Sequence, residues 1–244
     1  MELAYRFPDG TTKYRMEATA SARWDIGGAG RGSYRVVFDV TEEVSEDDGD
    51  SAVVTVTMSP LEVSEEGLAS PGTADRSFAI EIDRNGGVLD VLEVDGVDAT
   101  DLDPDELAFI GTYRPPLPVN PVALGDGWQS EQEVEVGPVF QQLVTLGELE
   151  SLYRDADGPV AQLTYEGDGP LVWTTDLPQG SAELTGAATM EGVADFDIDA
   201  GTLRSATSST EGDFDVRVVP PGRGGTPLTG TLHFDLDLEL TAAG

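Results

Sequence analysis

The run TLHFDLDLEL near the carboxyl end alternates apolar and polar residues without a break. This pattern is typical of a β-strand with one face on a core and the other in water. The same alternation recurs along the chain, starting almost at once with Leu3, Tyr5 and Phe7. Turn signals such as DDGD, DRNGG and DADG separate the runs. Long alternating runs joined by tight turns predict an all-β, mainly antiparallel fold.

One segment, DLDPDELAFIG, has a different pattern. Asp103 is a suitable N-cap, Pro104 suits the first helical position, Glu106 can complete the cap and Gly111 can end a helix. The following stretch carries four prolines and cannot be a central strand. We therefore predict a connection over residues 101–125 that holds one short helix and a proline-rich linker.

Similar landmarks occur on both sides of this connection. An Asp-Gly turn precedes a long alternating run at Asp9 and again at Asp126, and a second Asp-containing turn recurs at Asp83 and Asp199 at nearly the same spacing. Such spacing indicates an internal duplication. We predict two similar β-meander halves, residues 1–100 and 126–244, which form one compact unit as a strongly bent sheet or half-barrel.

The charge is strongly negative, because 47 acidic residues face 13 basic ones and give a formal net charge of -34. Such a charge repels nucleic acid and anionic membrane surfaces, so neither is an expected partner. Acidic excess with a single lysine, Lys13, is typical of solubility in high salt or of a GC-rich genome; a specific cation-binding role is the alternative. No apolar run is long enough for a membrane span.

The chain offers little for catalysis, since it has no cysteine and one histidine. His233 lies near Asp235 on the polar side of the final run and could act as a general base beside a carboxylate. No G-x-S-x-G motif accompanies it. A surface histidine on a polar strand face is the interpretation we favour, so we assign no catalytic residue.

Two further sets of residues are candidates for ligand binding. Asp195, Asp197 and Asp199 resemble the start of a calcium loop, but Ala206 stands where a bidentate Glu is required. We therefore predict no metal and no cofactor. The tryptophans fit packing in the core or at sheet edges, with ligand stacking as the alternative; they are Trp24, Trp128 and Trp173.

The sequence also resembles a known group. The pattern Y-x-F-x-x-G at Tyr5–Gly10, the pattern P-x-x-P-V-x-x-G-D-x-W within Pro116–Trp128 and the paired Asp-Gly turns resemble uncharacterised exported, lipoprotein-like domains of high-GC bacteria. In outline these are similar to lipoprotein carriers and mycobacterial lipid-binding lipoproteins. That resemblance implies a bent antiparallel sheet that cradles an acyl chain under short helices. The chain departs from it in having no cysteine to lipidate.

We therefore expect a noncatalytic, extracytoplasmic binding module for an apolar or amphipathic ligand such as a lipid. A cell-surface structural or interaction domain with a filled core is the alternative, and a hydrolase is a distant third. No leader precedes the first run, so an extracytoplasmic or cell-surface location requires its removal, and otherwise the protein is cytoplasmic. We expect a monomer. The candidate apolar lining comprises Phe38, Phe78, Ile80, Phe196, Leu232, Phe234 and Leu236.

Overall fold

The computed structural model describes residues 1–8, 10–70, 74–102, 107, 110, 113–136, 139–177, 180–220 and 226–243. Twelve strands form a single antiparallel sheet, which is the predicted all-β fold class. A 3-10 turn, η1 (Ala99–Asp101), follows the sixth strand. The strands are β1 (Thr11–Ile26), β2 (Ala29–Asp47), β3 (Ser51–Glu66), β4 (Arg76–Asp83), β5 (Val88–Val94), β6 (Val97–Asp98), β7 (Gly127–Val136), β8 (Val139–Arg154), β9 (Pro159–Leu177), β10 (Gly180–Asp197), β11 (Thr202–Val219) and β12 (Leu228–Ala242).

The strand order is β6-β5-β4-β3-β2-β1-β12-β11-β10-β9-β8-β7. Each half of the chain is thus a meander of sequential neighbours, and the first and last strands join the two. Thirteen residue pairs, from Tyr14↔Ala242 to Ile26↔Gly230, align β1 with β12. The final strand, β12, therefore lies in the middle of the sheet, between β1 and β11.

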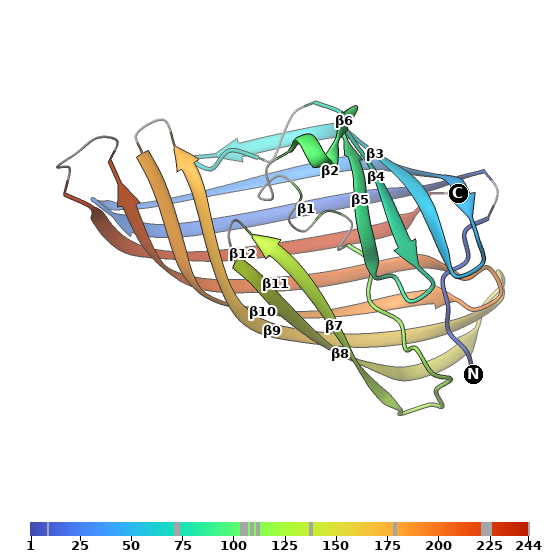
Figure 1. Ribbon diagram of the computed structural model, residues 1–244. Helices are drawn as coiled ribbons and strands as arrows, with labels where there is room; N and C mark the ends of the chain where they lie inside the picture. Colours follow the sequence, from blue (N-terminus) through green and yellow to red (C-terminus); the bar gives the residue numbers. More distant parts are fainter. Residues whose placement is uncertain are drawn as a thin grey trace.

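The sheet is strongly bent, so that the strands at its two ends come round to the same side of its middle (Figure 1). Alternation places one face of every long strand on the concave side. In β1 the buried residues are two apart, from Tyr14 to Ala22, and in β9 Leu163 and Tyr165 are buried in the same way. The predicted period of two is therefore realised as one buried face and one wet face.

The first eight residues differ from the prediction of a strand. Leu3 and Tyr5 are buried at 2% and 3% exposure, but residues 1–8 join no strand of the sheet. They cross the concave side instead: the Tyr5 amide donates to the Arg84 carbonyl, and the Arg6 amide donates to the Gly201 carbonyl. The alternation reflected packing against the core and not pairing within a sheet.

The connection between the halves also packs on the concave side. Leu117 and Val122 are buried in the same core as the first residues, and the Tyr5 hydroxyl donates to the Pro115 carbonyl at 3.0 Å. The predicted helix lies outside the described residues at Asp103, Pro104, Glu106 and Gly111. Among the described residues, no helix is long and apolar enough to cross a membrane.

Candidate functional site

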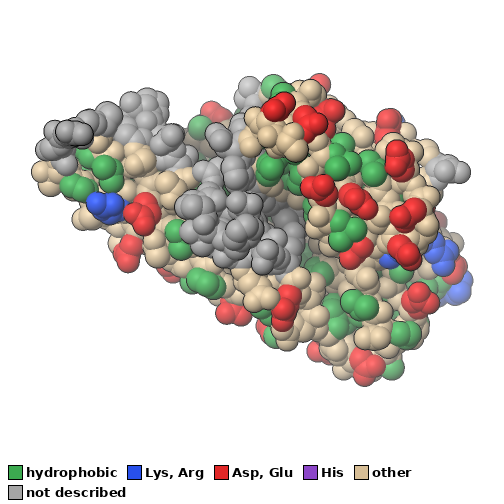
Figure 2. Space-filling view, in the orientation of Figure 1, with side chains coloured by type: hydrophobic (Ala, Val, Ile, Leu, Met, Phe, Trp, Pro, Cys, Tyr) green, Lys and Arg blue, Asp and Glu red, His purple; other side chains and the backbone are tan. Residues whose placement is uncertain are grey.

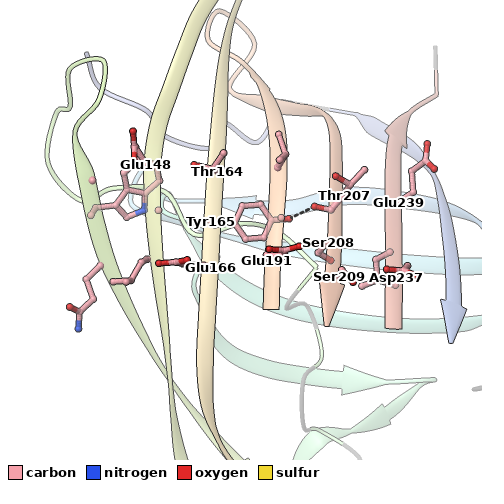
Figure 3. Close-up of a pocket in the computed structure, with 18 of the residues that line it drawn as sticks. Glu148, Thr164, Tyr165, Glu166, Glu191, Thr207, Ser208, Ser209, Asp237 and Glu239 are labelled. Carbon is pink, nitrogen blue, oxygen red and sulfur yellow. Dashed lines mark hydrogen bonds between the residues drawn. The ribbon is translucent and has the colours of Figure 1, made fainter. Parts of the chain in front are cut away.

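A groove of about 1110 Å³ crosses seven neighbouring strands, from β7 through β12 to β1. Each strand contributes two residues that are two positions apart, and every strand except β1 also contributes the residue between them. Strand pairing arranges these residues in two rows across the sheet (Figure 3). One row is Gln129, Leu146, Glu166, Glu191, Ser209, Asp237 and Thr19; the other is Gly127, Glu148, Thr164, Val193, Thr207, Glu239 and Glu17.

Strand alternation places these rows on the outer face of the sheet. In β12, Leu240 is buried at 4% exposure in the core, so Asp237 and Glu239 project from the opposite side. In β9, Leu163 faces the core and Thr164 projects outward. The groove therefore lies on the face that the sequence marks as wet.

Two glycines in the floor of the groove allow aromatic rings to lie flat on the concave side. A Cβ at Gly192 would stand 2.3 Å from the Tyr165 ring, and one at Gly147 would stand 2.4 Å from the Trp128 ring. The Tyr165 hydroxyl donates to the Thr207 carbonyl, and the Trp128 indole donates to the Pro116 carbonyl at 3.0 Å. These rings seal the sheet behind the groove in the manner of aromatic cover over strand glycines.

The groove carries a dense negative charge. Six of its lining residues are carboxylates: Glu17, Glu148, Glu166, Glu191, Asp237 and Glu239. Glu166 and Glu191 face each other directly across β9 and β10, an arrangement that is destabilising for like charges. An added cation would relieve this repulsion.

Within the described residues, a single one of these six carboxylates has a salt bridge. The Arg35 guanidinium binds Glu17 at 2.5 Å, and its hydrogen bonds hold the pKa of that carboxyl below its usual range. The other five face the groove without a basic partner in the described part of the chain. A second hollow of about 410 Å³ continues the groove and adds Asp168 and Glu211 to its lining.

Apolar side chains interrupt the charge. Leu146 and Val193 are 44% and 39% exposed on the outer face, one in each row. Thr164 and Thr207 flank Val193 in its row, and Ser209 lies between Glu191 and Asp237 in the other row. The groove can therefore contact charged, hydrogen-bonding and apolar parts of one extended ligand.

His233 lies on the same outer face but outside the groove lining. Its Nδ1 is 2.9 Å from Asp213 and its Nε2 is 3.1 Å from Asp235, and the hydrogen bond with Asp213 raises the pKa of the imidazole. The Ser21 hydroxyl donates to Asp235 at 2.8 Å and not to the imidazole. These contacts form an ionic link between strands and do not pair a nucleophile with a base. Within the described residues, no three His, Asp or Glu side chains converge as metal ligands.

The predicted apolar lining is divided between two regions of the concave side. Phe38, Phe78, Ile80 and Phe196 belong to the packed core, with exposures of 6%, 8%, 0% and 1%. Leu232, Phe234 and Leu236 are half-buried along β12, on the same face and further from that core. The structure therefore does not bring the seven residues into one pocket.

Sequence reasoning missed the groove residues because they have the composition of an ordinary solvated strand face. The alternation of the final run predicted that Asp237 and Glu239 face outward, but nothing in the sequence distinguished the other groove carboxylates from the many acidic residues of the chain. The prediction that the tryptophans pack against the sheet pointed to part of the groove floor. Trp128 packs on Gly147, and Trp24 packs in the same way on Gly30. The strand register brings these residues side by side across seven strands, and a single strand read alone does not show it.

Comparison with known proteins gives this molecule no family: no protein-family model and no curated protein sequence matches the chain. The fold and the site still define a class. It is an open, bent, twelve-stranded antiparallel sheet with a hydrophobic core on its concave side and an acidic groove on its outer face.

Proposed function

We propose that the protein is a noncatalytic binding module that acts outside the cytoplasm and holds an extended, amphipathic, positively charged ligand in the outer groove. The observation that carries this proposal is the pair of outward-facing rows, in which five carboxylates have no basic partner among the described residues. The exposed Leu146 and Val193 supply the apolar contacts of an amphipathic ligand. The extracytoplasmic location rests on the resemblance to exported lipoprotein-like domains.

The size of the groove narrows the ligand. Seven strands at the usual spacing of about 4.8 Å give a length of about 29 Å, which matches about eight or nine extended peptide residues at about 3.3 Å each. A basic ligand gains Coulomb energy along the rows, while its apolar groups contact Leu146 and Val193. The gain is sensitive to salt because the groove is open to solvent.

Isothermal titration calorimetry with defined peptides tests the proposal. An eight-residue peptide that alternates Lys and Leu should bind at low salt, and its affinity should fall as salt is raised. A matched Glu-Leu peptide should not bind. No heat from either peptide, or equal heat from both, would overturn the proposal.

Matched variants locate the binding. Replacement of three groove carboxylates, Glu166→Gln, Glu191→Gln and Asp237→Asn, should weaken binding of the Lys-Leu peptide by about tenfold or more, since each lost contact of this kind is worth up to about 1 kcal/mol. The control replaces three exposed carboxylates of the first half: Glu46→Gln, Asp90→Asn and Glu93→Gln. If both sets lower the affinity equally, the acidity acts as a general field and the groove is not the site.

A second candidate ligand is a lipid on the concave side. The half-buried Leu232, Phe234 and Leu236 beyond the packed core favour it. Native mass spectrometry of the gently purified protein, with organic extraction of anything released, tests this version. A stoichiometric lipid adduct would support it, and a clean mass after incubation with mixed lipids would contradict it. Failure of both ligands would favour the filled-core structural or interaction domain.

A further inference from the structure

A buried ion pair joins the connection between the halves to β2. Arg114 and Glu42 have side-chain exposures of 4% and 8%, and the Arg114 Nη2 lies 2.6 Å from the Glu42 Oε2. The Tyr113 hydroxyl donates to the other carboxylate oxygen, Oε1. Both oxygens of Glu42 are therefore engaged by the connection.

The other side of the guanidinium lies among aromatic rings. Its central carbon is 5.7 Å from the Tyr5 ring centroid, 5.9 Å from that of Phe7 and 5.4 Å from that of Tyr113. These rings stabilise the charge but accept no conventional hydrogen bond. The Arg114 Nη1 is buried and has no hydrogen-bond partner among the described residues.

An unpaired, charged N–H donor is costly in a protein interior, and nearly all such groups are satisfied by protein or by ordered water. A small cavity lies beside Arg114. Its volume is about 10 Å³, which is the lower limit for holding one water molecule. Four hydroxyl-bearing residues share its lining with Arg114: Tyr5, whose hydroxyl donates to the Pro115 carbonyl, and Thr12, Tyr14 and Thr202.

The charged residues around the cavity favour a water molecule over an anion. Glu42 lines the same cavity and already neutralises the Arg114 guanidinium, so a chloride ion would lie beside a carboxylate in a buried site. The other cation of the lining, Arg6, is exposed and donates from its Nη1 to the Asp199 carbonyl at 2.8 Å. A buried charge without compensation is strongly disfavoured. A neutral molecule that both accepts from Arg114 and donates to a hydroxyl oxygen meets the requirement.

We propose that this cavity is a binding site for one structural water molecule, which accepts a hydrogen bond from the Arg114 Nη1 and bridges it to the hydroxyl groups of the lining. The hydrated ion pair fastens three separate segments together on the concave side: the amino-terminal residues, the connection and the β1–β2 pair. This inference is independent of any ligand in the outer groove.

A crystal structure of the full chain at about 1.5 Å, with and without a bromide soak, tests the assignment directly. The expected result is one density peak within hydrogen-bonding distance of the Arg114 Nη1 that gives no anomalous signal after the soak. An anomalous peak at that position would assign an anion and overturn the proposal. A cavity without density would also overturn it.

A pair of valine variants gives a solution test. Val54 lines the cavity, whereas Val56 is buried on the same face of β3 but outside the lining. The added methyl of Val54→Ile should displace the water and leave the guanidinium unsatisfied, which should lower the Tm by about 2 to 4 °C more than Val56→Ile does. A Tm for Val54→Ile equal to or above that of Val56→Ile would indicate a dry cavity. If Val54→Ile does not fold, the crystal structure of the unaltered protein decides.

Discussion

Along β10 the two faces of the sheet follow different rules. On the concave face Phe196 is 1% exposed, and its ring meets that of Tyr5 edge-on at 5.5 Å between centroids. On the outer face Glu191 is exposed and opposes another glutamate, Glu166. Packing of buried side chains stabilises the concave face, whereas repulsion between neighbouring carboxylates destabilises the outer face. The packed concave face therefore carries most of the stability, and the outer face is where we propose that the ligand binds. Acidic side chains outnumber basic ones on the surface that Figure 2 presents.

The largest effect that separates the faces should come from truncating the core aromatic. Phe196→Ala removes a fully buried ring and should lower the free energy of unfolding by about 3 to 5 kcal/mol. Its control, Val193→Ala, lies on the outer face of the same strand and should cost about 0.5 kcal/mol or less. Urea denaturation followed by tryptophan fluorescence measures both. Equal losses would contradict the division between the faces.

A smaller loss of stability should come from adding a methyl group to Gly192, the glycine of the groove floor that packs against the Tyr165 ring. Gly192→Ala places a Cβ 2.3 Å from the Tyr165 ring and 2.6 Å from the Thr207 carbonyl oxygen, so overpacking should cost about 1 to 3 kcal/mol. Gly169→Ala, on the neighbouring strand, meets no atom closer than 3.7 Å and should be nearly neutral. Thermal unfolding of the two variants makes the comparison. If Gly192→Ala is as stable as Gly169→Ala, the packing of the Tyr165 ring on the groove floor does not require a glycine at position 192.

Each half of the chain also contains an arginine that binds acidic residues near its turns. Arg84 binds Asp47 at 2.5 Å, and Arg204 binds Asp155 and Asp197 at 2.6 and 2.7 Å, so each arginine ties together two turns of its own half. Arg204→Met should therefore cost about 1 kcal/mol, since partly exposed ion pairs contribute little. Chemical denaturation at neutral pH measures this loss.

Acid should abolish this contribution. Hydrogen bonds from Arg204 and from turn amides lower the pKa of Asp155, while for Asp197 the same bonds outweigh the effect of desolvation and also lower the pKa. A carboxylate with a depressed folded-state pKa adds stability above its unfolded value of about 3.8 and loses it as the pH falls through the folded value. The deficit of Arg204→Met should therefore shrink below about pH 3.8. A deficit that is constant with pH would contradict the ionic account.

The smallest expected effect belongs to His233. Its hydrogen bond with Asp213 and the charge of Asp235 raise its folded-state pKa above 6.5. The resulting stabilisation is complete below about pH 6.5 and disappears as the pH rises through the folded value. His233→Gln should be slightly less stable than the unaltered protein at pH 6 and indistinguishable from it at high pH. The opposite pH dependence would show that the neutral imidazole is the stabilising form.

Much of the fold could be predicted because strand alternation and turn chemistry are local. The run that became β12 identified its buried face from Leu232 to Leu240 and its wet face from His233 to Glu239. The pairing of β1 with β12 could not be predicted in the same way, because register between distant strands depends on the closure of the whole sheet. Alternation alone does not prove a strand: Leu3, Tyr5 and Phe7 alternate because they pack in the core, although they form no strand of the sheet.

The site was only partly predictable. The outward-facing carboxylates Asp237 and Glu239 follow from the alternation of the final run, and the acidic surplus follows from composition. Their convergence into a groove depends on the strand register across seven strands, and its floor depends on the close packing of aromatic rings on Gly147 and Gly192. The Arg114–Glu42 pair was also not predictable, because it joins positions 72 residues apart (114 − 42) through the tertiary fold.

The most direct test of the central claim is a methyl NMR titration of the protein with the Lys-Leu peptide. Leu146 and Val193 report on the outer groove, whereas Leu232 and Leu236 report on the concave face. The account predicts saturable shifts of the Leu146 and Val193 methyl signals, with those of Leu232 and Leu236 unchanged. Shifts confined to the Leu232 and Leu236 signals, or no shifts at all, would contradict it.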